Sequence, residues 1–309
     1  MYDRINMWLG KDSVSGVDLL AETSCYLDKA TEETKDGNTS ISGSLNNLIV
    51  KIYDTGISIK GSPAKYYLGD NFKTLTRQDT EHCIEKLSDT LKLPIKDAKP
   101  TKMDLAQTFI VNHPPTEYYS LLGNSQYYDR LEQPNSLYYS NGNRTKLFYD
   151  KKKEGKKRGL IIPEVWIGQN VLRYEYRLTQ RANTYLGFDY MKVEDLYQED
   201  TYIKFIDQYI SEFENITKNR EIQFNLDNCK SPKDFMKQLQ LKAINEIGQT
   251  ELINMVEHMR KRETFDKPEY YSRLKKELIE LCNKPNHSEP SLLIEELTNK
   301  IKAVRENYR

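Results

Sequence analysis

The sequence lacks a long apolar run, so no segment of it is expected to span a membrane. It also lacks a basic stretch followed by an apolar core near its start, which is the pattern of a secretory signal. Charged residues make up 30% of the chain, and the mean hydropathy is -0.77. We therefore expect a soluble cytoplasmic protein without a membrane partner.

The chain is also poor in the residues that build disulfides and zinc sites. Its four cysteines are Cys25, Cys83, Cys229 and Cys282. Its four histidines are His82, His113, His258 and His287. The cysteines form no CxxC pair, and no two histidines have the spacing of metal ligands on one helix or strand. The sequence therefore predicts neither a disulfide framework nor a Cys/His zinc site.

An excess of charge of one sign is missing as well, since Lys and Arg total 46 and Asp and Glu total 46. The net charge thus argues neither for nor against a nucleic-acid partner, and the distribution of charge must decide. Tyrosine, by contrast, is abundant, with 22 residues. Because most tyrosines pack or stack, a single tyrosine carries weight only through its neighbours.

The hydrophobic pattern divides the chain into two parts. Strand-like alternation predicts strands at 2–9, 48–53, 56–60, 102–110, 136–140, 145–150 and 171–179. Helical spacing predicts helices at 79–92, 116–122, 193–218, 231–245, 249–263, 267–283 and 290–306. The predicted fold class is α+β, with a mixed or antiparallel sheet domain over residues 1–190 and a helical C-terminal region over residues 191–309.

Tyr149 ends a predicted strand that runs into a strongly basic segment. Residues 144–158 hold eight cations against two acids. Around Gly155 this segment is interpreted either as a hairpin turn with a solvated surface or, beside Tyr149, as a phosphate-binding loop. A tyrosine hydroxyl attacks a DNA phosphodiester when cations bind the phosphates, so Tyr149 is the candidate nucleophile. Its neighbouring cations in sequence are Lys146, Lys151 and Lys152.

The predicted strand at 171–179 carries Arg173, Glu175 and Arg177 on one face, because side chains alternate along a strand. This row fits an exposed surface with self-paired charges about as well as it fits a functional site. In the functional interpretation, Glu175 is a metal ligand between two phosphate-binding arginines.

Asp104 lies inside another predicted strand, where aspartate is disfavoured. It is either a bulge or edge residue, or a second carboxylate for Mg²⁺ or Mn²⁺. Lys60 and Lys65 flank Gly61-Ser62-Pro63. That segment is either an ordinary turn after a strand or a loop that presents backbone N–H groups and two cations to a phosphate.

Taken together and in order, these segments resemble the filamentous-phage gene II/gene X replication initiator family over residues 3–188. An N-terminal strand with Asp3 resembles the start of that family. The other matching segments are Ile59 to Lys65 (IKxSPAK), Gly69-Asp70-Asn71 (GxN), Met103 to Ala106 (R-I-D-A), Thr145 to Glu154 (T-L-x-x-Y-x-K-x-x-E) and Arg173 to Arg177 (R-F-E-A-R). Each motif is weak alone, whereas the ordered set is specific.

The resemblance implies a rolling-circle replication initiator in a bacterial host. Such a protein binds the origin of a circular double-stranded phage or plasmid DNA, nicks one strand, and holds the 5′ end as a phosphotyrosine. The 3′-OH then primes synthesis, and the displaced single strand is later rejoined. Host helicase and polymerase would be further partners.

The family's roles then fall on residues of this chain. Tyr149 and Lys151 would be catalytic, and Asp104 and Glu175 would hold Mg²⁺ or Mn²⁺. The expected DNA-binding residues are Lys60, Lys65, Lys146, Lys152, Arg173 and Arg177. We expect the cations near Tyr149 to lower its pKa from about 10 by stabilising the phenolate. A non-catalytic origin-binding initiator, a mobilisation relaxase with the same chemistry, and a structural protein whose tyrosines only pack are the alternatives.

Overall fold

The computed structural model describes residues 1–309 except 15, 180–181, 186, 220–228, 284–290 and 308–309. Its described residues divide into two compact units. The first unit comprises Met1–Thr217 together with Glu296–Arg309, and the second comprises Lys218–Glu295. No helix among the described residues is both long enough and apolar enough to cross a bilayer.

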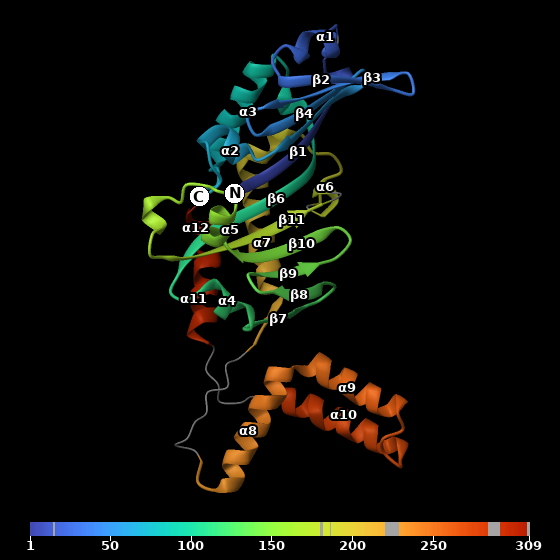
Figure 1. Ribbon diagram of the computed structural model, residues 1–309, viewed down its shortest axis with the longest axis vertical. Helices are drawn as coiled ribbons and strands as arrows, with labels where there is room; N and C mark the ends of the chain where they lie inside the picture. The colour runs from blue at the N-terminus through green and yellow to red at the C-terminus, as the bar shows by residue number, and fades with distance from the viewer. Residues whose placement is uncertain (15, 180–181, 186, 220–228, 284–290, 308–309) are drawn as a thin grey trace. The chain divides into compact units, whose positions relative to one another are not determined.

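The first unit is built on a ten-stranded sheet in which neighbouring strands run antiparallel (Figure 1). In sheet order the strands are β2 (Asp28–Lys35), β3 (Asn38–Leu45), β4 (Leu48–Tyr53), β5 (Gly56–Gly61), β1 (Tyr2–Gly10), β6 (Lys99–Val111), β11 (Asn170–Leu178), β10 (Arg144–Asp150), β9 (Ser136–Ser140) and β8 (Asp129–Gln133). Two short strands, β7 (Leu122–Ser125) and β12 (Ile216–Lys218), form a separate sheet.

Short and long helices surround this sheet. They are α1 (Leu19–Ser24), α2 (Pro63–Leu68), α3 (Arg77–Leu91), α4 (Pro115–Tyr119), α5 (Lys151–Lys157), α6 (Ala182–Tyr185), α7 (Glu199–Glu214), α11 (Leu292–Lys302) and α12 (Val304–Asn307). Four 3₁₀ turns accompany them: η1 (Lys11–Ser13), η2 (Ile95–Asp97), η3 (Glu164–Trp166) and η4 (Val193–Tyr197).

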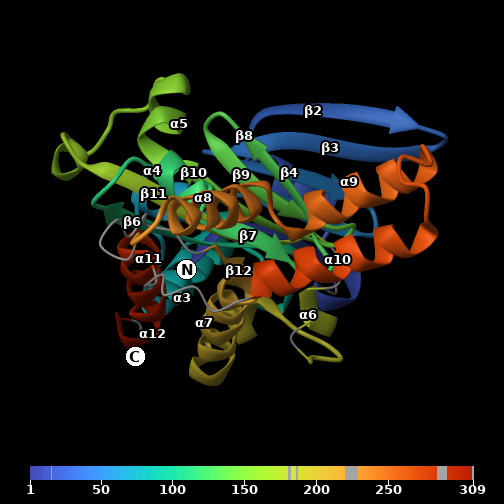
Figure 2. The same cartoon turned by 90° about the horizontal axis from the view of Figure 1, so that it is seen from below.

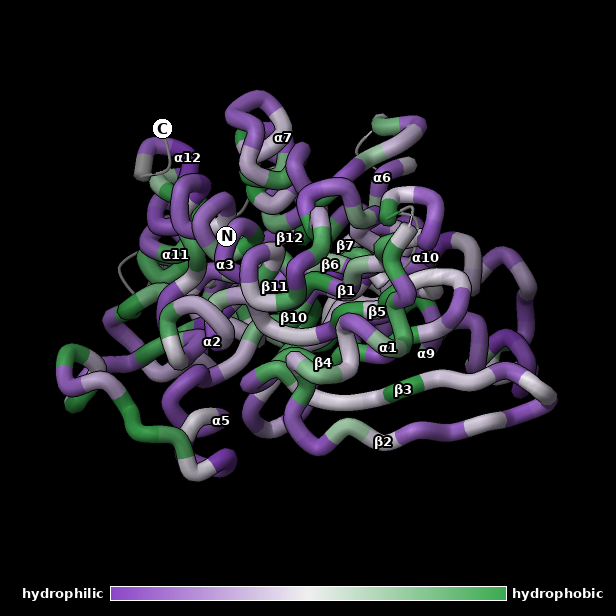
Figure 3. Tube along the Cα trace, turned by 90° about the horizontal axis from the view of Figure 1, so that it is seen from above, coloured by the Kyte–Doolittle hydropathy of each residue, from purple (hydrophilic) through white to green (hydrophobic). Residues whose placement is uncertain are grey.

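Helix α7 covers one face of β10 and β11. Tyr174 of β11 packs on Tyr209 with ring centroids 4.5 Å apart, and Phe148 of β10 packs on Phe213 at 6.2 Å. Burial of these aromatic rings fixes the helix against the sheet and leaves the opposite face of the two strands for other side chains. Helix α5 lies on that opposite face (Figure 3).

The second unit is a small group of helices, α8 (Pro232–Ile247), α9 (Gln249–Lys261) and α10 (Pro268–Asn283). Helices α9 and α10 run side by side (Figure 2) and bury Val256 and Tyr271 between them and their connection. An ion pair of 3.2 Å joins Lys275 on α10 to Glu257 on α9. Both side chains are partly exposed, so this pair adds little stability.

The predicted α+β class, with a large antiparallel sheet and a helical C-terminal region, is confirmed. The predicted strands at 2–9, 48–53, 56–60, 102–110, 136–140, 145–150 and 171–179 correspond to β1, β4, β5, β6, β9, β10 and β11. The connection between the predicted helices at 267–283 and 290–306 lies outside the described residues. Strands β2, β3, β7, β8 and β12 were not predicted. Every residue of β2 is exposed and no apolar alternation marks it, and β12 falls within the helix predicted at 193–218.

The division between the two units differs from the predicted boundary at residue 190. Helix α7 belongs with the sheet, because its Tyr202, Phe205 and Phe213 are fully buried there. The chain also returns to the first unit from Glu296 onward, where Glu296 accepts hydrogen bonds from Tyr118 and from the backbone of Asn112. Helical periodicity alone does not reveal on which core a helix packs.

Candidate active site

Tyr149 lies near the end of β10, on the face opposite α7. Its hydroxyl donates a hydrogen bond of 2.6 Å to Oε1 of Glu175 on the neighbouring strand β11. The two residues are held by strand register, since Tyr149 pairs directly with Arg173 and Glu175 is two residues further along the same face. The predicted nucleophile and one predicted metal ligand are therefore in direct contact.

Both carboxylate oxygens of Glu175 are occupied by arginines as well. Arg173 donates from Nε to Oε1 at 3.0 Å. Arg177 donates from Nη2 and Nε to Oε2 at 2.6 and 2.9 Å. The predicted shared face of these three residues is thus confirmed. The charges are self-paired, but the row is not the exposed surface that this interpretation assumed. Arg173 and Glu175 are almost fully buried, whereas the Arg177 side chain is 35% exposed.

The row of charges continues at both ends. Arg173 lies 2.8 Å from Oδ1 of Asp3 on β1, and Arg177 lies 3.8 Å from Oδ2 of Asp104 on β6. A register shift between Tyr2 and Arg4 makes a β-bulge in β1, and such a bulge re-aims side chains. It leaves Tyr2 buried with α7 and lets Asp3 reach the Arg173 guanidinium.

The segment that follows α2 contributes hydrogen bonds to this row through Asn71. Asn71 donates from its side chain to Asp3 at 3.0 Å and accepts from Nζ of Lys151 at 3.2 Å. Arg173 donates to the backbone carbonyl of Asn71 at 3.0 Å. Lys151, only 1% exposed, also pairs with Glu154 at 3.0 Å. Lys151 therefore lies within the cluster, and Asp3 and Asn71 join it although no chemical role was predicted for either of them.

Helix α5 follows Tyr149 directly and replaces the turn predicted near Gly155. Asp150 caps it by accepting a hydrogen bond from the Lys153 backbone N–H. A Cβ at Gly155 would lie 2.9 Å from the end of the Ile162 side chain and 3.3 Å from the Phe72 ring. Gly155 therefore lies where α5 packs closely against the segments that hold Ile162 and Phe72. The cations around Gly155 are arranged on this helix.

The pKa of Tyr149 is shifted in the direction opposite to our expectation. Burial raises it well above its usual value; Arg173 opposes this rise, and the charge and hydrogen bond of Glu175 add to it. The lysines expected to lower it have other partners or lie elsewhere. The hydroxyl is thus protonated in this state and donates its proton to a carboxylate.

The two predicted metal ligands differ sharply in their acidity. Burial favours the neutral form of Glu175, but Arg173 and Arg177 outweigh it and hold the pKa of Glu175 at about 2. Burial raises the pKa of Asp104 to about 7, with Glu175 adding to the rise and Arg177 opposing it. Glu175 is therefore ionised at neutral pH, while Asp104 is close to half-protonated.

The oxygen donors of Asp104 and Glu175 are chemically suited to Mg²⁺ or Mn²⁺. However, the Arg177 guanidinium contacts both carboxylates, and both Glu175 oxygens already accept hydrogen bonds. No group of three or more His, Cys, Asp or Glu side chains among the described residues is placed to hold a metal ion. The arrangement as it stands does not fit a metal shared by Asp104 and Glu175.

Three other predicted DNA-binding lysines lie apart from the row of charges. Lys60 is exposed on β5, separated from β10 by β1, β6 and β11, and Lys65 is half-buried on α2. The predicted turn before Lys65 is the start of that helix, with Ser62 as its cap. Lys152 is half-buried on α5.

Lys146 faces the opposite side of the sheet from Tyr149. It is fully buried and pairs with Glu212 of α7 at 2.8 Å. In this conformation it offers no surface to a phosphate, because a period of two places it with Phe148 in the α7 core. The neighbouring tyrosines also divide between the faces: Tyr138 lies on the Tyr149 face and Tyr139 is buried on the other.

A protein-family model for the N-terminal part of a phage replication-associated protein, of the filamentous-phage gene II type, matches residues 1–212 of the chain. The match includes every residue of the row of charges and ends inside α7. A search of curated proteins found no match.

Proposed function

The chain belongs to the family of phage replication-associated proteins of the gene II type, and we propose that it initiates rolling-circle replication by nicking one strand of a circular DNA origin through Tyr149. The observation that carries this proposal is the short hydrogen bond between the Tyr149 hydroxyl and Glu175, on a sheet face flanked by the basic helix α5. One tyrosine among 22 is weak evidence by itself, but a half-buried tyrosine that is hydrogen-bonded to a charged carboxylate beside the part-exposed Arg177 is a candidate site.

The proposed step is the exchange of one phosphodiester for another. The Tyr149 oxygen forms a bond to the scissile phosphorus, and the bond from phosphorus to the 3′ oxygen breaks. The tyrosine loses one proton, and the departing 3′ oxygen gains one. The product is a 5′-phosphotyrosine and a free 3′-OH, so bond energy is nearly conserved and the reverse reaction reseals the strand.

Glu175 is the proton acceptor nearest to Tyr149, but a carboxylate with a pKa of about 2 is a weak base. A DNA phosphate that binds the part-exposed Arg177 would draw that guanidinium away from Glu175. The pKa of Glu175 would then rise, because one of its two arginine partners is lost. We therefore propose that phosphate binding makes Glu175 a better base only when substrate is in place.

The surrounding cations suit binding of the DNA backbone. Arg177 reaches the surface from the row of charges, and Lys152 lies on α5 next to Lys151. Lys151 and Arg173 are buried, so their proposed roles are to hold Asn71 and Glu175 in position. Lys60 and Lys65 would bind duplex DNA further along the sheet.

A requirement for Mg²⁺ or Mn²⁺ is also part of the proposal. Once Arg177 has moved, Asp104 would supply a carboxylate oxygen to that ion while Glu175 remains the proton acceptor, and the ion would supply positive charge next to the scissile phosphate. Double-stranded origin DNA, the single strand that it releases, and the host helicase and polymerase are the proposed partners.

A nicking assay tests the proposal. Purified protein is incubated with supercoiled circular DNA that carries the origin of its own genetic element, with Mg²⁺ or Mn²⁺ and in parallel with EDTA. We expect open circles with protein bound covalently to the 5′ end, formed only with metal. The Tyr149→Phe variant should form none, while it should still bind the origin.

Tyr138→Phe is the matched control, because Tyr138 lies on the same sheet face on the adjacent strand β9. It should nick like the wild type. If Tyr149→Phe nicks normally and Tyr138→Phe does not, the nucleophile is assigned wrongly. If the wild type binds the origin tightly and never nicks, the chain is a non-catalytic initiator.

A further inference from the structure

The connection between α5 and β11 presents aliphatic side chains to solvent. We name residues 159–169 the α5–β11 loop. Ile161 is 92% exposed, Val165 70% and Ile167 69%. Single exposed aliphatic residues are common on proteins, but three in one short loop form a feature that calls for a partner.

The loop is held in place by its other side chains. Trp166 packs edge-on against Phe72 with ring centroids 5.0 Å apart, and Leu160 and Ile162 pack against the same cluster. Ile162 also closes on Gly155 of α5. The loop therefore points one set of apolar residues inward and a second set outward, from a fixed platform.

Backbone hydrogen bonds fix the two ends of the platform as well. The Leu160 N–H donates to the Gly155 carbonyl at 2.9 Å. The N–H groups of Trp166 and Ile167 donate to the carbonyls of Pro163 and Glu164, each at 2.9 Å. The backbone that carries the outward side chains is thus fixed by hydrogen bonds, so these side chains keep pointing to solvent.

This platform adjoins the candidate active site. Phe72, which anchors the loop, directly follows Asn71 of the cluster around Arg173. Nζ of Lys151 lies 5.5 Å from the Phe72 ring centroid and 5.9 Å from that of Tyr149. The loop is therefore connected to the nucleophile through its Trp166 and then through Phe72 and Lys151.

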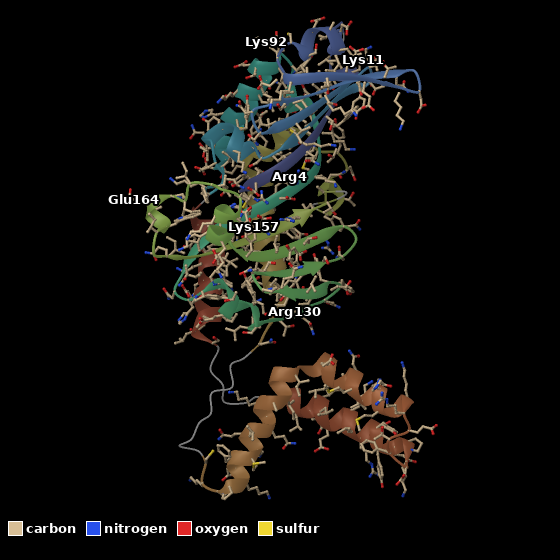
Figure 4. All side chains as sticks on the ribbon, in the orientation of Figure 1. Arg4, Lys11, Lys92, Arg130, Lys157 and Glu164 are labelled. Atoms are coloured by element: carbon tan, nitrogen blue, oxygen red, sulfur yellow. The ribbon has the colours of Figure 1, made fainter. Side chains whose placement is uncertain are left out.

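The positive charge on α5, next to the loop, indicates which kind of partner the loop binds. The exposed cations on α5 and at its C-terminal cap are Lys153, Lys156, Lys157 and Arg158, while the loop itself holds one charged residue, Glu164. In Figure 4, Glu164 lies at the outer end of the loop and Lys157 lies on α5 near the sheet. Cations beside aliphatic side chains suit a DNA strand, whose phosphates bind cations and whose base faces are apolar.

We propose that Ile161, Val165 and Ile167 act as a wedge that inserts between base pairs next to the nick site. The wedge holds the two strands apart while the cations of α5 bind the adjacent phosphates. Base pairing holds the backbone of a duplex in a regular geometry, whereas an unpaired strand can bend its scissile phosphate towards Tyr149. Aliphatic side chains are the type that proteins insert to unstack bases. This inference rests on the proposed function and assigns the opening of the DNA to this loop.

The test compares duplex and single-stranded substrates for the triple variant Ile161→Ser, Val165→Ser and Ile167→Ser. Nicking of relaxed duplex origin DNA should fall at least ten-fold. Cleavage of a single-stranded oligonucleotide with the same site should stay within about two-fold of wild type, since the chemistry at Tyr149 is untouched. A duplex with a preformed bubble at the site should restore nicking. Equal loss on all three substrates, or no loss on the relaxed duplex, overturns the wedge.

Ile49→Ser with Leu131→Ser is the matched control, because these aliphatic side chains are 59% and 55% exposed on β4 and β8. This control should nick all three substrates like the wild type. A second measurement does not depend on cleavage: permanganate oxidation of thymines in origin DNA bound to Tyr149→Phe protein. Oxidation beside the nick site that disappears in the triple variant supports the wedge even if the nickase proposal fails, and its absence in Tyr149→Phe itself overturns it.

Discussion

Glu175 and Glu212 lie against opposite faces of β10 and β11, and each binds two cations and accepts hydrogen bonds from tyrosine, one for Glu175 and two for Glu212 (Tyr176 and Tyr128). Glu212 pairs with Lys146 at 2.8 Å and Arg144 at 3.0 Å and accepts a hydrogen bond from Tyr176 at 3.2 Å. Glu175 has Arg173, Arg177 and Tyr149 in the same roles. The two clusters share their chemical composition almost fully, so composition alone does not make one of them a site.

The difference lies at the edges of the two clusters. The Glu212 cluster is covered by α7 and is the more closed of the two, since its Lys146 is fully buried and its Arg144 is 21% exposed. The Glu175 cluster opens at Arg177, which is 35% exposed, and has a further carboxylate beyond it in Asp104, whose pKa is raised to about 7. A closed ionic cluster holds a helix on a sheet, whereas an open one can exchange an internal partner for a phosphate.

The largest expected effect comes from breaking the closed cluster. Glu212→Gln leaves Lys146 buried next to a neutral group, and removing one partner of a buried pair costs about 3–5 kcal/mol of unfolding free energy. The measurement is urea unfolding followed by circular dichroism. Nicking per folded molecule should be unchanged below the transition. A variant as stable as the wild type that had lost nicking would reverse the roles that we assign to the two clusters.

Glu175→Gln is the corresponding change in the open cluster. It removes the proton acceptor of Tyr149, so nicking should fall about a hundred-fold or more, the usual contribution of a general base. The loss of stability should be smaller than for Glu212→Gln, because Arg173 keeps its contact with Asp3 and Arg177 reaches solvent. The rate of open-circle formation measures the first effect and urea unfolding the second. Unchanged nicking would remove Glu175 from the mechanism.

The open cluster was more accessible to sequence reasoning than the closed one. Period-two alternation brought Arg173, Glu175 and Arg177 to one face, and the strand prediction placed Tyr149 near them. The same rule, applied to β10, would have put Lys146 on the opposite face from Tyr149. The prediction grouped Lys146 with Tyr149 because the two residues are close in sequence. In a strand, however, residues three apart point to opposite faces of the sheet.

Other parts of the site depend on contacts that periodicity does not encode. The position of Asp3 follows from a β-bulge, and that of Asn71 from the path of the chain after α2. The rise of the Tyr149 pKa follows from burial and from the charge and hydrogen bond of Glu175. Counting nearby cations predicted the wrong sign, because desolvation outweighed them.

Asp104 provides a pH test of the difference between the clusters. The folded protein keeps the Asp104 proton up to about pH 7, whereas the unfolded chain releases it near its usual pKa of about 3.9. Between these values the folded state binds more protons, so this contribution to stability is complete at low pH and is lost as pH rises. In EDTA, we expect the contribution of Asp104 to the unfolding free energy to fall by roughly 2 kcal/mol from pH 5 to pH 7.

Asp104→Asn should remove that part of the pH dependence. The measurement is the unfolding free energy of both proteins at several pH values in EDTA, and the informative quantity is their difference. All other titrating groups are shared and cancel. A difference that is constant from pH 5 to pH 7 would mean that Asp104 is ionised throughout, and that Arg177 dominates over burial.

The smallest expected change compares the two tyrosines. Tyr176→Phe removes a hydrogen bond to Glu212, and Tyr149→Phe removes one to Glu175, so each should cost about 1 kcal/mol of unfolding free energy. Their effects on DNA should differ completely: Tyr176→Phe should nick at the wild-type rate, because its hydroxyl lies in the closed cluster on the α7 face. Urea unfolding and the nicking assay on the same two preparations measure both quantities. If Tyr176→Phe abolishes nicking while its unfolding free energy falls by only this amount, the Glu212 cluster takes part in the chemistry. The functional distinction between the Glu212 cluster and the Glu175 cluster would then be wrong.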